Sequence, residues 1–240
     1  MRILLTRPEP GAALTAARLR GLGHEVVSDP MLRIVETGAP LPAGPFDAVA
    51  FTSPNAARAV AGRLEGLPAF AVGSRTAAEA RAAGFLNVMD CAGDAAALAR
   101  TLAERLKPGA RIFHPAGEDR AADLATLLAA RGVSVITHIV YRAPEAEALS
   151  SETRAALRDG TLDAALHFSP RTVRALLRCV SEAGQMEPFR ALRHFCLSQA
   201  VAAPLAAAGM AVTLAPQPHE EALLALLGEA AEVAPGMPPV

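Results

Sequence analysis

The sequence contains an internal repeat, and this repeat is the strongest constraint on the fold. Residues 47–58 (DAVAFTSPNAAR) return 116 residues later as residues 163–174 (DAALHFSPRTVR), with Asp, Ala, Ser, Pro and Arg at matching positions. Each copy predicts a short apolar strand, a Ser-Pro turn and a helix start, because serine caps helices and proline is tolerated at the first helical position. The chain is therefore expected to consist of two related halves.

Two further repeats extend the pattern. One has an offset of 109 residues and the other an offset of 125. The growth of the offset from 116 to 125 means that the last repeated unit carries nine extra residues, which we expect in an elongated loop within 179–192. We name the repeated units A, B, A′ and B′, which start near residues 3, 47, 111 and 163. The matching pairs are Ile3 and Ile112, Leu19 and Leu128, Gly23 and Gly132, Phe70 and Phe195, Ala77 and Ala202, and Gly84 and Gly209.

Strands alternate with helices throughout, which predicts parallel sheets with helices on both faces. We expect an α/β protein of two doubly wound, Rossmann-like domains with flavodoxin-like strand order. A segment with four prolines follows unit A (residues 30–45), and a second segment follows unit A′ (residues 139–145); both are predicted linkers. Their length allows unit A to share a sheet with either B or B′.

Composition excludes several classes of protein. The net charge of −1 gives no basic footprint for a nucleic acid. No apolar segment approaches the ~20 residues of a membrane helix, and the N-terminal segment does not read as a signal peptide. The three cysteines have neither paired nor metal-like spacing, which favours free thiols in a reducing compartment. We expect a soluble, cytoplasmic protein.

The loops at the carboxyl ends of the strands are where such sheets bind ligands. Most of these loops pair a hydroxyl with a helix start, where free N–H groups and the helix dipole favour carboxylate or phosphate. Plain helix capping is the alternative for any single loop. The candidate residues for anion binding are Arg7, Thr52, Ser53, Arg75, Thr76, Gly117, Ser169, Arg171 and Ser198.

Other common chemistries lack their motifs. No Gly-x-Gly-x-x-Gly, Walker or Gly-x-Ser-x-Gly motif is present, and the histidines lack metal-ligand spacing, so we expect neither cofactor nor metal. His114 and His167 end strands and are either packed or directed into the cleft. Tyr141 is the only tyrosine and lies in the second linker beside Arg142. It either packs the linker or supplies a hydroxyl to the cleft between the domains.

Several short motifs together resemble the uroporphyrinogen-III synthase family over residues 1–230. Each motif is loose, and their order and spacing carry the resemblance. Relatives often have threonines in the loop at 198–201, where this chain offers only Ser198. The motifs are LTRP at 5–8, FTSPNA at 51–56, AVGSRTA at 71–77, GEDR at 117–120, VYR at 140–142, FSPRTV at 168–173 and the P…ALL close at 216–224.

The resemblance implies a segment-swapped tandem duplication. Residues 1–33 with 146–230 would form one domain and 40–138 the other, with 34–39 and 139–145 as a two-stranded linker. Residues 231–240 are expected to be a disordered tail. The resemblance further implies a monomer without cofactor or metal.

It also implies the reaction, which is the dehydrating cyclisation of hydroxymethylbilane, a linear tetrapyrrole octacarboxylate, with inversion of ring D to give uroporphyrinogen III. Such an enzyme is a hydro-lyase of tetrapyrrole biosynthesis, and the resemblance allows transient contact with hydroxymethylbilane synthase. Tyr141 matches the linker tyrosine that is the family's proposed acid. Thr76, Ser53 and Ser169 match its threonine and its two Ser-Pro turns.

Two other functions compete with this interpretation. A non-catalytic two-domain protein that binds a small anion shares the architecture, but would normally carry a signal peptide or an output domain. A nucleotide-sugar transferase would need a basic diphosphate site and usually a longer chain.

Overall fold

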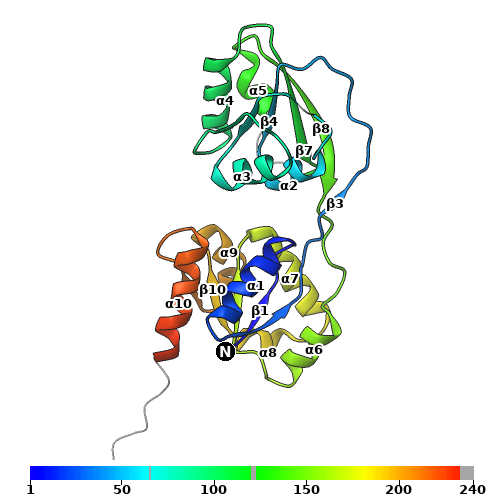
Figure 1. Cartoon of the computed structure of the whole chain (residues 1–240). Coiled ribbons are helices and arrows are strands. Elements are labelled where there is room, and N and C mark those ends of the chain that lie inside the picture. The colour runs from blue at the N-terminus through cyan, green and yellow to red at the C-terminus, as the bar shows by residue number, and fades with distance from the viewer. Residues whose placement is uncertain (65, 120–122, 233–240) are drawn as a thin grey trace, which may run out of the picture. The chain divides into compact units, whose positions relative to one another are not determined.

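The chain forms two compact units. The computed structural model describes residues 1–64, 66–119 and 123–232 (Figure 1). Unit 1 contains Met1–Arg33 and the described part of Pro144–Val240, and unit 2 contains Ile34–Ala143. Arg120 of the GEDR motif and residues 233–240 of the expected tail lie outside the described residues.

Unit 1 is built on a parallel sheet of five strands in the order β11-β10-β9-β1-β2. The first two strands therefore share a sheet with strands that follow more than 130 residues later. The elements are β1 (Arg2–Leu5), α1 (Gly11–Gly21), β2 (Glu25–Ser28), α6 (Ser151–Arg158), β9 (Ala164–His167), α7 (Pro170–Glu182), α8 (Met186–Arg190), β10 (Arg193–Cys196), α9 (Gln199–Ala207), β11 (Val212–Leu214) and α10 (Glu220–Glu232).

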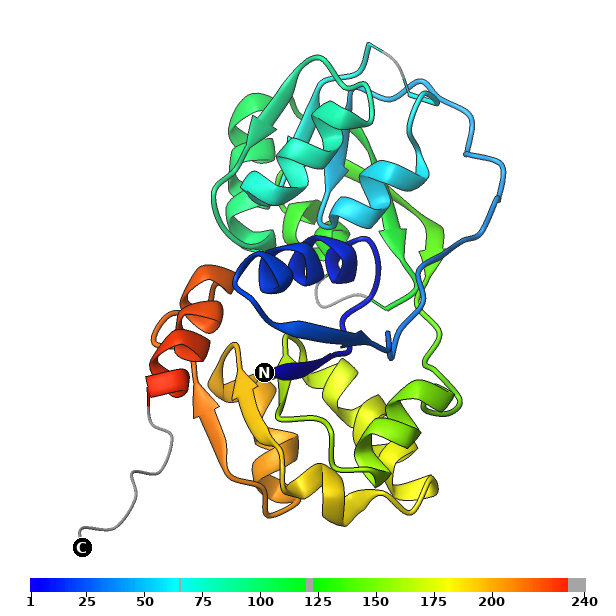
Figure 2. The ribbon, with the colours of Figure 1, turned by 60° about the horizontal axis from the view of Figure 1, so that its bottom comes forward.

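Alternate residues of these strands face two separate apolar layers. Ile3 and Leu5 of β1 pack with α1 and α10, whereas Leu4 packs with α6, α7, α8 and α9. This is the period of two expected for a strand that is buried on both faces. Figure 2 shows α1 and α10 covering the first of these faces.

Unit 2 has six strands in the order β3-β8-β7-β4-β5-β6, of which β3 alone is antiparallel to its neighbour. Helices α2 and α3 cover one face and α4 and α5 cover the other. The elements are β3 (Val35–Glu36), β4 (Ala48–Phe51), α2 (Pro54–Ala59), β5 (Ala69–Ala71), α3 (Ser74–Ala82), β6 (Val88–Asp90), α4 (Ala95–Arg105), β7 (Arg111–Gly117), α5 (Leu124–Ala129) and β8 (Ser134–Arg142). The α/β fold with parallel sheets that the alternating pattern predicts is confirmed.

Helix ends follow the predicted chemistry in most places. Ser53 and Ser169 cap α2 and α7 and accept hydrogen bonds from the backbone N–H groups of Asn55 and Thr172. Gly23 follows α1 with φ +80°, a conformation that glycine adopts without strain.

The elongated loop expected within 179–192 is wrong, because most of this segment is helical. The structure has α7 continuing to Glu182 and a short helix, α8, at Met186–Arg190. Gly184, with φ +66°, separates the two helices. Pro188 lies in the first turn of α8, where the missing N–H costs no hydrogen bond, so its presence does not exclude a helix.

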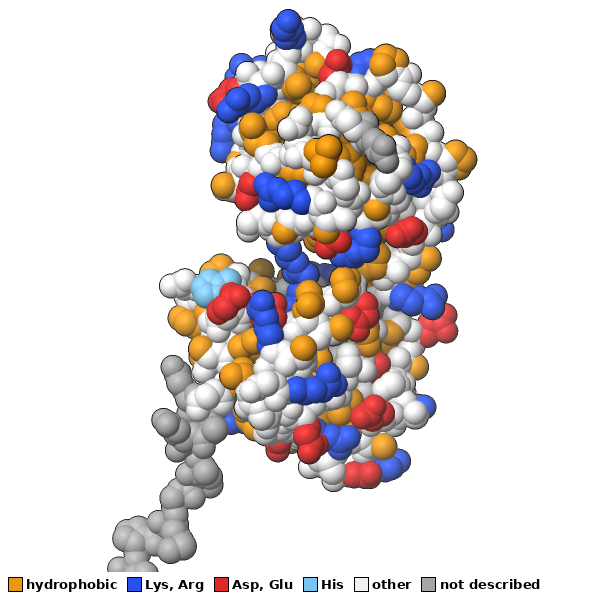
Figure 3. Space-filling view, viewed as in Figure 1, with side chains coloured by type: hydrophobic (Ala, Val, Ile, Leu, Met, Phe, Trp, Pro, Cys, Tyr) orange, Lys and Arg blue, Asp and Glu red, His pale blue; other side chains and the backbone are white. Residues whose placement is uncertain are grey.

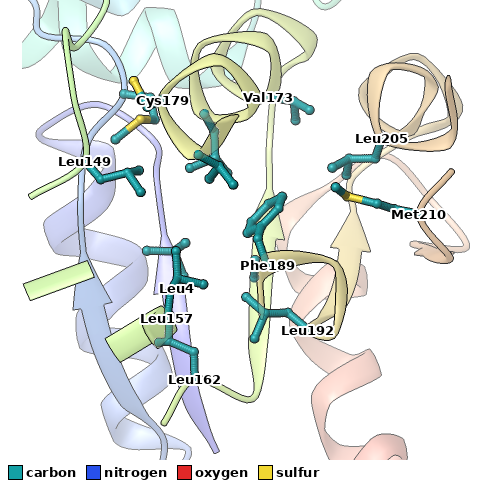
Figure 4. Packing of buried hydrophobic residues seen from close by; sticks show 14 of the residues in the cluster. Leu4, Leu149, Leu157, Leu162, Val173, Cys179, Phe189, Leu192, Leu205 and Met210 are labelled. Carbon is teal, nitrogen blue, oxygen red and sulfur yellow. The ribbon is translucent and has the colours of Figure 1, made fainter. Parts of the chain in front are cut away.

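Helix α8 also supplies the centre of the larger apolar layer of unit 1. Phe189 is fully buried and belongs to the same cluster as Leu4, Leu157 and Leu205. In Figure 4 its ring points into the middle of this cluster. Because the chain has few aromatic residues, a single phenylalanine fills a large share of this layer.

We predict that Phe189→Ala lowers the free energy of unfolding by about 3–5 kcal/mol, because the void left by the ring is added to the lost apolar burial. Leu86, which is 94% exposed, is the matched control, and Leu86→Ala should change stability by less than about 0.5 kcal/mol. Urea unfolding measures both, and equal effects of the two changes would contradict this packing.

Candidate functional site

Each sheet has one point where the strand order reverses, and doubly wound proteins bind their ligands there. In unit 2 this point lies between β4 and β7, because α2 after β4 and α5 after β7 cover opposite faces. In unit 1 it lies between β1 and β9, which are followed by α1 and α7 on opposite faces. The candidate residues at or beside these points are Thr52, Ser53 and Gly117 in unit 2 and Arg7, Ser169 and Arg171 in unit 1.

In unit 2 the single tyrosine meets the first Ser-Pro turn. The Tyr141 hydroxyl donates a hydrogen bond of 3.1 Å to Ser53 Oγ. Ser53 Oγ also accepts from the Asn55 N–H at 3.2 Å as the cap of α2. With both bonds accepted, the serine keeps its own O–H proton to donate elsewhere. The structure thus joins two candidates that are 88 residues apart.

A β-bulge directs Tyr141 toward this turn. The pairing of β7 with β8 passes from Ala116–Ile139 to Gly117–Tyr141, so β8 carries one extra residue, Val140. Side chains alternate along a regular strand, and the extra residue changes which face Tyr141 occupies. Both Val140 and Tyr141 pack with the cluster under α2.

Gly117 provides the space for the ring. A Cβ atom at Gly117 would lie 2.6 Å from Tyr141 Cζ and 2.7 Å from its hydroxyl oxygen. No real Cβ contact is that short, so any side chain here would displace the tyrosine. Gly117 therefore makes room for the ring by lacking a side chain, and the binding role expected for it stays a prediction.

Thr52 belongs to a second hydrogen-bonded group, in which the buried His114 joins two hydroxyls. Nε2 of His114 lies 3.1 Å from Thr52 Oγ1, and its Nδ1 lies 3.2 Å from Thr137 Oγ1. His114 is 1% exposed, which makes it a packed histidine rather than one open to solvent. Of the two alternatives for His114, the structure supports the packed one.

Arg75 and Thr76 lie in the first turn of α3, which follows β5. The cap position, Gly73, has no side chain to satisfy the free N–H groups of this turn. Thr76 is buried, whereas Arg75 is exposed and has no hydrogen bond or ion pair within the described residues. An uncapped helix start with a free guanidinium beside it is suited to a carboxylate.

In unit 1, Arg7 is buried and already paired. Its guanidinium lies 2.9 Å from Glu220 Oε2 and donates to Thr15 Oγ1 at 2.8 Å. It also stacks over the Phe168 ring at 4.3 Å. These contacts tie the loop after β1 to α1 and α10, and a ligand carboxylate would have to compete with Glu220 for the charge.

The other unit 1 candidates differ in how fully they are engaged. Ser169 caps α7, and its Oγ lies 2.7 Å from Thr172 Oγ1. Arg171 is half-buried, with Nε 3.7 Å from Glu145 Oε1. Ser198 is the N-cap of α9, and within the described part of the chain its side chain makes no cap hydrogen bond, which leaves its hydroxyl and the first N–H groups of α9 open. By the repeat, α9 corresponds to α3, and both helices start uncapped.

A pair of buried histidines lies in the same unit. Nε2 of His167 is 3.1 Å from Nδ1 of His194, whose Nε2 is 3.1 Å from the Phe189 carbonyl oxygen. The carbonyl only accepts, so His194 donates to it through Nε2; a neutral His194 then accepts from His167 through Nδ1. Burial lowers the pKa of His167 to about 3, with a further lowering from His194, and burial lowers the pKa of His194 to about 4.

The histidine pair predicts a loss of stability in mild acid. Unfolded histidines titrate near 6.5, so below that pH the unfolded chain binds protons that the folded chain excludes. The stability is complete above about pH 6.5 and should fall by about 2–4 kcal/mol between pH 7 and pH 5.

Urea unfolding at several pH values measures this slope, and His167→Leu should make it shallower. His219→Gln, a change at an exposed histidine, is the control and should leave the slope unchanged. A slope that is identical in His167→Leu would contradict the interpretation.

On the described part of the chain, the visible charge distribution and the metal-ligand side chains give no further site. On the face shown in Figure 3, basic and acidic side chains are interspersed over each unit. Residues 1–64, 66–119 and 123–232 contain no group of three or more His, Cys, Asp or Glu that could hold a metal ion. Over the same residues, no helix is long and apolar enough to cross a membrane.

Three features of the site have no local signal in the sequence. The His114 bridge, the bulge at Val140 and the Arg7–Glu220 pair all depend on contacts between distant segments. The close approach of Tyr141 had one signal in the sequence, which is Gly117 at the end of a predicted strand, because a glycine there often marks a place where another group comes near the backbone.

Comparisons with known proteins agree with this architecture. A family profile described as "Uroporphyrinogen-III synthase HemD" matches residues 13–225. No curated protein sequence matches the chain significantly.

Solved structures show the same fold. A uroporphyrinogen-III synthetase from Helicobacter pylori 26695 is 18% identical, with a TM-score of 0.64 over 96% of this chain and 100% of that one. A mutant uroporphyrinogen III synthase from the extremely thermophilic bacterium Thermus thermophilus is also 18% identical, with a TM-score of 0.53 over 98% of this chain and 100% of that one.

Proposed function

Because the chain belongs to the uroporphyrinogen-III synthase family, we propose that it converts hydroxymethylbilane to uroporphyrinogen III. The observation that carries the proposal at the level of residues is the hydrogen bond of 3.1 Å between the Tyr141 hydroxyl and Ser53 Oγ at the strand-order reversal of unit 2. The reaction is a dehydration followed by ring closure, which places the enzyme among the hydro-lyases.

Tyr141 is the proposed acid. Its phenol gives a proton to the substrate hydroxyl, the C–O bond breaks, and the departure of water produces an electrophilic azafulvenium cation beside the phenolate. Ring D then attacks through its substituted position to form a spiro intermediate, which rearranges to the inverted isomer. The final loss of a proton from the closing pyrrole returns the proton to the phenolate, so the whole reaction releases only water.

Ser53 can support the phenolate that forms. In the resting state Ser53 Oγ accepts from the tyrosine. Once the phenol has lost its proton, the serine can turn its own O–H toward the phenolate oxygen. A hydrogen bond that forms only as charge develops lowers the barrier rather than merely binding the substrate.

The substrate carboxylates are proposed to bind at helix starts and at arginines of both units. The exposed Arg75 beside the uncapped α3 and the open hydroxyl of Ser198 at α9 are the strongest candidates. The other predicted contributors are Thr52, Ser53, Thr76, Gly117, Ser169 and Arg171. Arg7 would act by sharing its charge between Glu220 and the substrate.

Several finer statements belong to the same proposal. We propose that the chain arose by a segment-swapped tandem duplication, with domains at 1–33 plus 146–230 and at 40–138. A monomeric cytoplasmic enzyme that meets hydroxymethylbilane synthase transiently would suit so unstable a substrate. The offsets that relate Ser53 to Ser169 and Gly23 to Gly132 support the duplication.

An isomer assay tests the function. Hydroxymethylbilane generated in the reaction mixture closes spontaneously to isomer I, so the purified protein should shift the oxidised porphyrins to isomer III. Isomer I alone, formed at the rate of the blank, would contradict the proposal and favour a non-catalytic anion-binding protein.

Tyr141→Phe tests the assigned acid. The change removes one hydroxyl and should lower kcat by about ten- to a hundredfold with the melting temperature nearly unchanged, because general acids contribute on this scale. Turnover of the variant equal to that of the unchanged protein would leave Tyr141 as a packing residue of β8.

A further inference from the structure

His114 lies where the backbone no longer holds two strands together. The pairing of β4 with β7 covers Ala48–Ile112 and Val49–Phe113 and, within the described residues, ends there. The turn that presents Ser53 therefore extends beyond the ladder. Separation of the two strands is expected at a strand-order reversal, since the helices that follow them leave toward opposite faces.

The side chain of His114 bridges this opening. It bonds Thr52, next to Ser53, at 3.1 Å and Thr137 of β8 at 3.2 Å. Thr137 lies on the same strand as Tyr141, four residues before it. One buried imidazole thus connects the segment that presents the serine to the strand that presents the tyrosine.

The bridge is satisfied in either tautomer. A neutral imidazole has one donor and one acceptor nitrogen, and each threonine hydroxyl can take the complementary role. Because His114 is 1% exposed and its chain neighbours Phe113 and Pro115 are buried, it has little freedom to move away. The two hydroxyls are therefore held at a fixed separation.

We infer that His114 is a positioning residue for the reaction, which sets the Tyr141–Ser53 geometry through Thr52 and Thr137. The inference rests on the proposed function for its effect on turnover. Its effect on the position of the tyrosine does not depend on activity.

The experiment uses the fact that the chain has one tyrosine and no tryptophan. In protein labelled with 3-fluorotyrosine, a single ¹⁹F resonance reports Tyr141. His114→Leu should shift or broaden this resonance, Thr137→Val should do so to a smaller extent, and His114→Gln should restore much of the original signal, because an amide also donates and accepts.

The second part of the experiment measures the kcat and KM of the same variants. His114→Leu should lower kcat about ten- to a hundredfold, the scale of a misplaced catalytic group, with KM little changed. In a Tyr141→Phe background the same change should cost nothing further. His138→Leu is the matched control, since Nε2 of His138 makes no hydrogen bond among the described residues, and it should alter neither readout.

Two results would overturn the positioning role of His114. A folded His114→Leu protein with an unchanged resonance and unchanged kcat would overturn the inference, as would a loss that persists in full in the Tyr141→Phe background. If His114→Leu does not fold, Thr137→Val removes one end of the bridge and carries the same test. If the unchanged protein yields only isomer I, the proposed function fails while the resonance still decides the positioning role.

Discussion

The parallel pairing of β1 with β9 is the constraint on which the chain's organisation depends. It joins Ile3 to Ala164 and Leu5 to Leu166, so unit 1 has no complete sheet until the chain has passed through all of unit 2. The pairing is buried on both faces, with Leu4 in one apolar layer and its neighbours in the other. Unit 2 is thus an insertion between the two segments of unit 1, joined to them at residues 33–34 and 143–144.

This arrangement gives each unit its own strand-order reversal, and the side chains at the two reversals differ. In unit 1 the arginine after β1 is neutralised by Glu220, and the buried histidines face the core. In unit 2 the reversal holds a tyrosine that contacts both a serine and a glycine, with His114 bonded to the neighbouring Thr52. We therefore propose that the chemistry takes place in unit 2, and that unit 1 contributes contacts to substrate carboxylates, among them the start of α9.

Local signals in the sequence predicted the elements well, because they depend on short-range physics. Serine before proline predicted the caps of α2 and α7, and the alternation of strands with helices predicted parallel sheets. The repeat also located the Ser-Pro turns and the helix starts where the candidate residues lie.

The remaining features depend on contacts that no local pattern encodes. The Arg7–Glu220 pair spans 213 residues, and the imidazole of His114 meets a hydroxyl 62 residues away. The bulge at Val140 is a difference in register between two strands, and neither strand reveals it alone. A short helix such as α8 has too few residues for periodicity to distinguish it from a loop.

The central claim is that Tyr141 acts from one fixed position over Gly117. The most direct measurement is the kcat of Gly117→Ala beside that of Gly21→Ala, a helical glycine whose added Cβ would meet nothing within 4 Å. A methyl group at Gly117 displaces the ring, so kcat should fall at least about tenfold in a folded protein, while Gly21→Ala keeps full turnover. Equal turnover of the two variants would contradict the account.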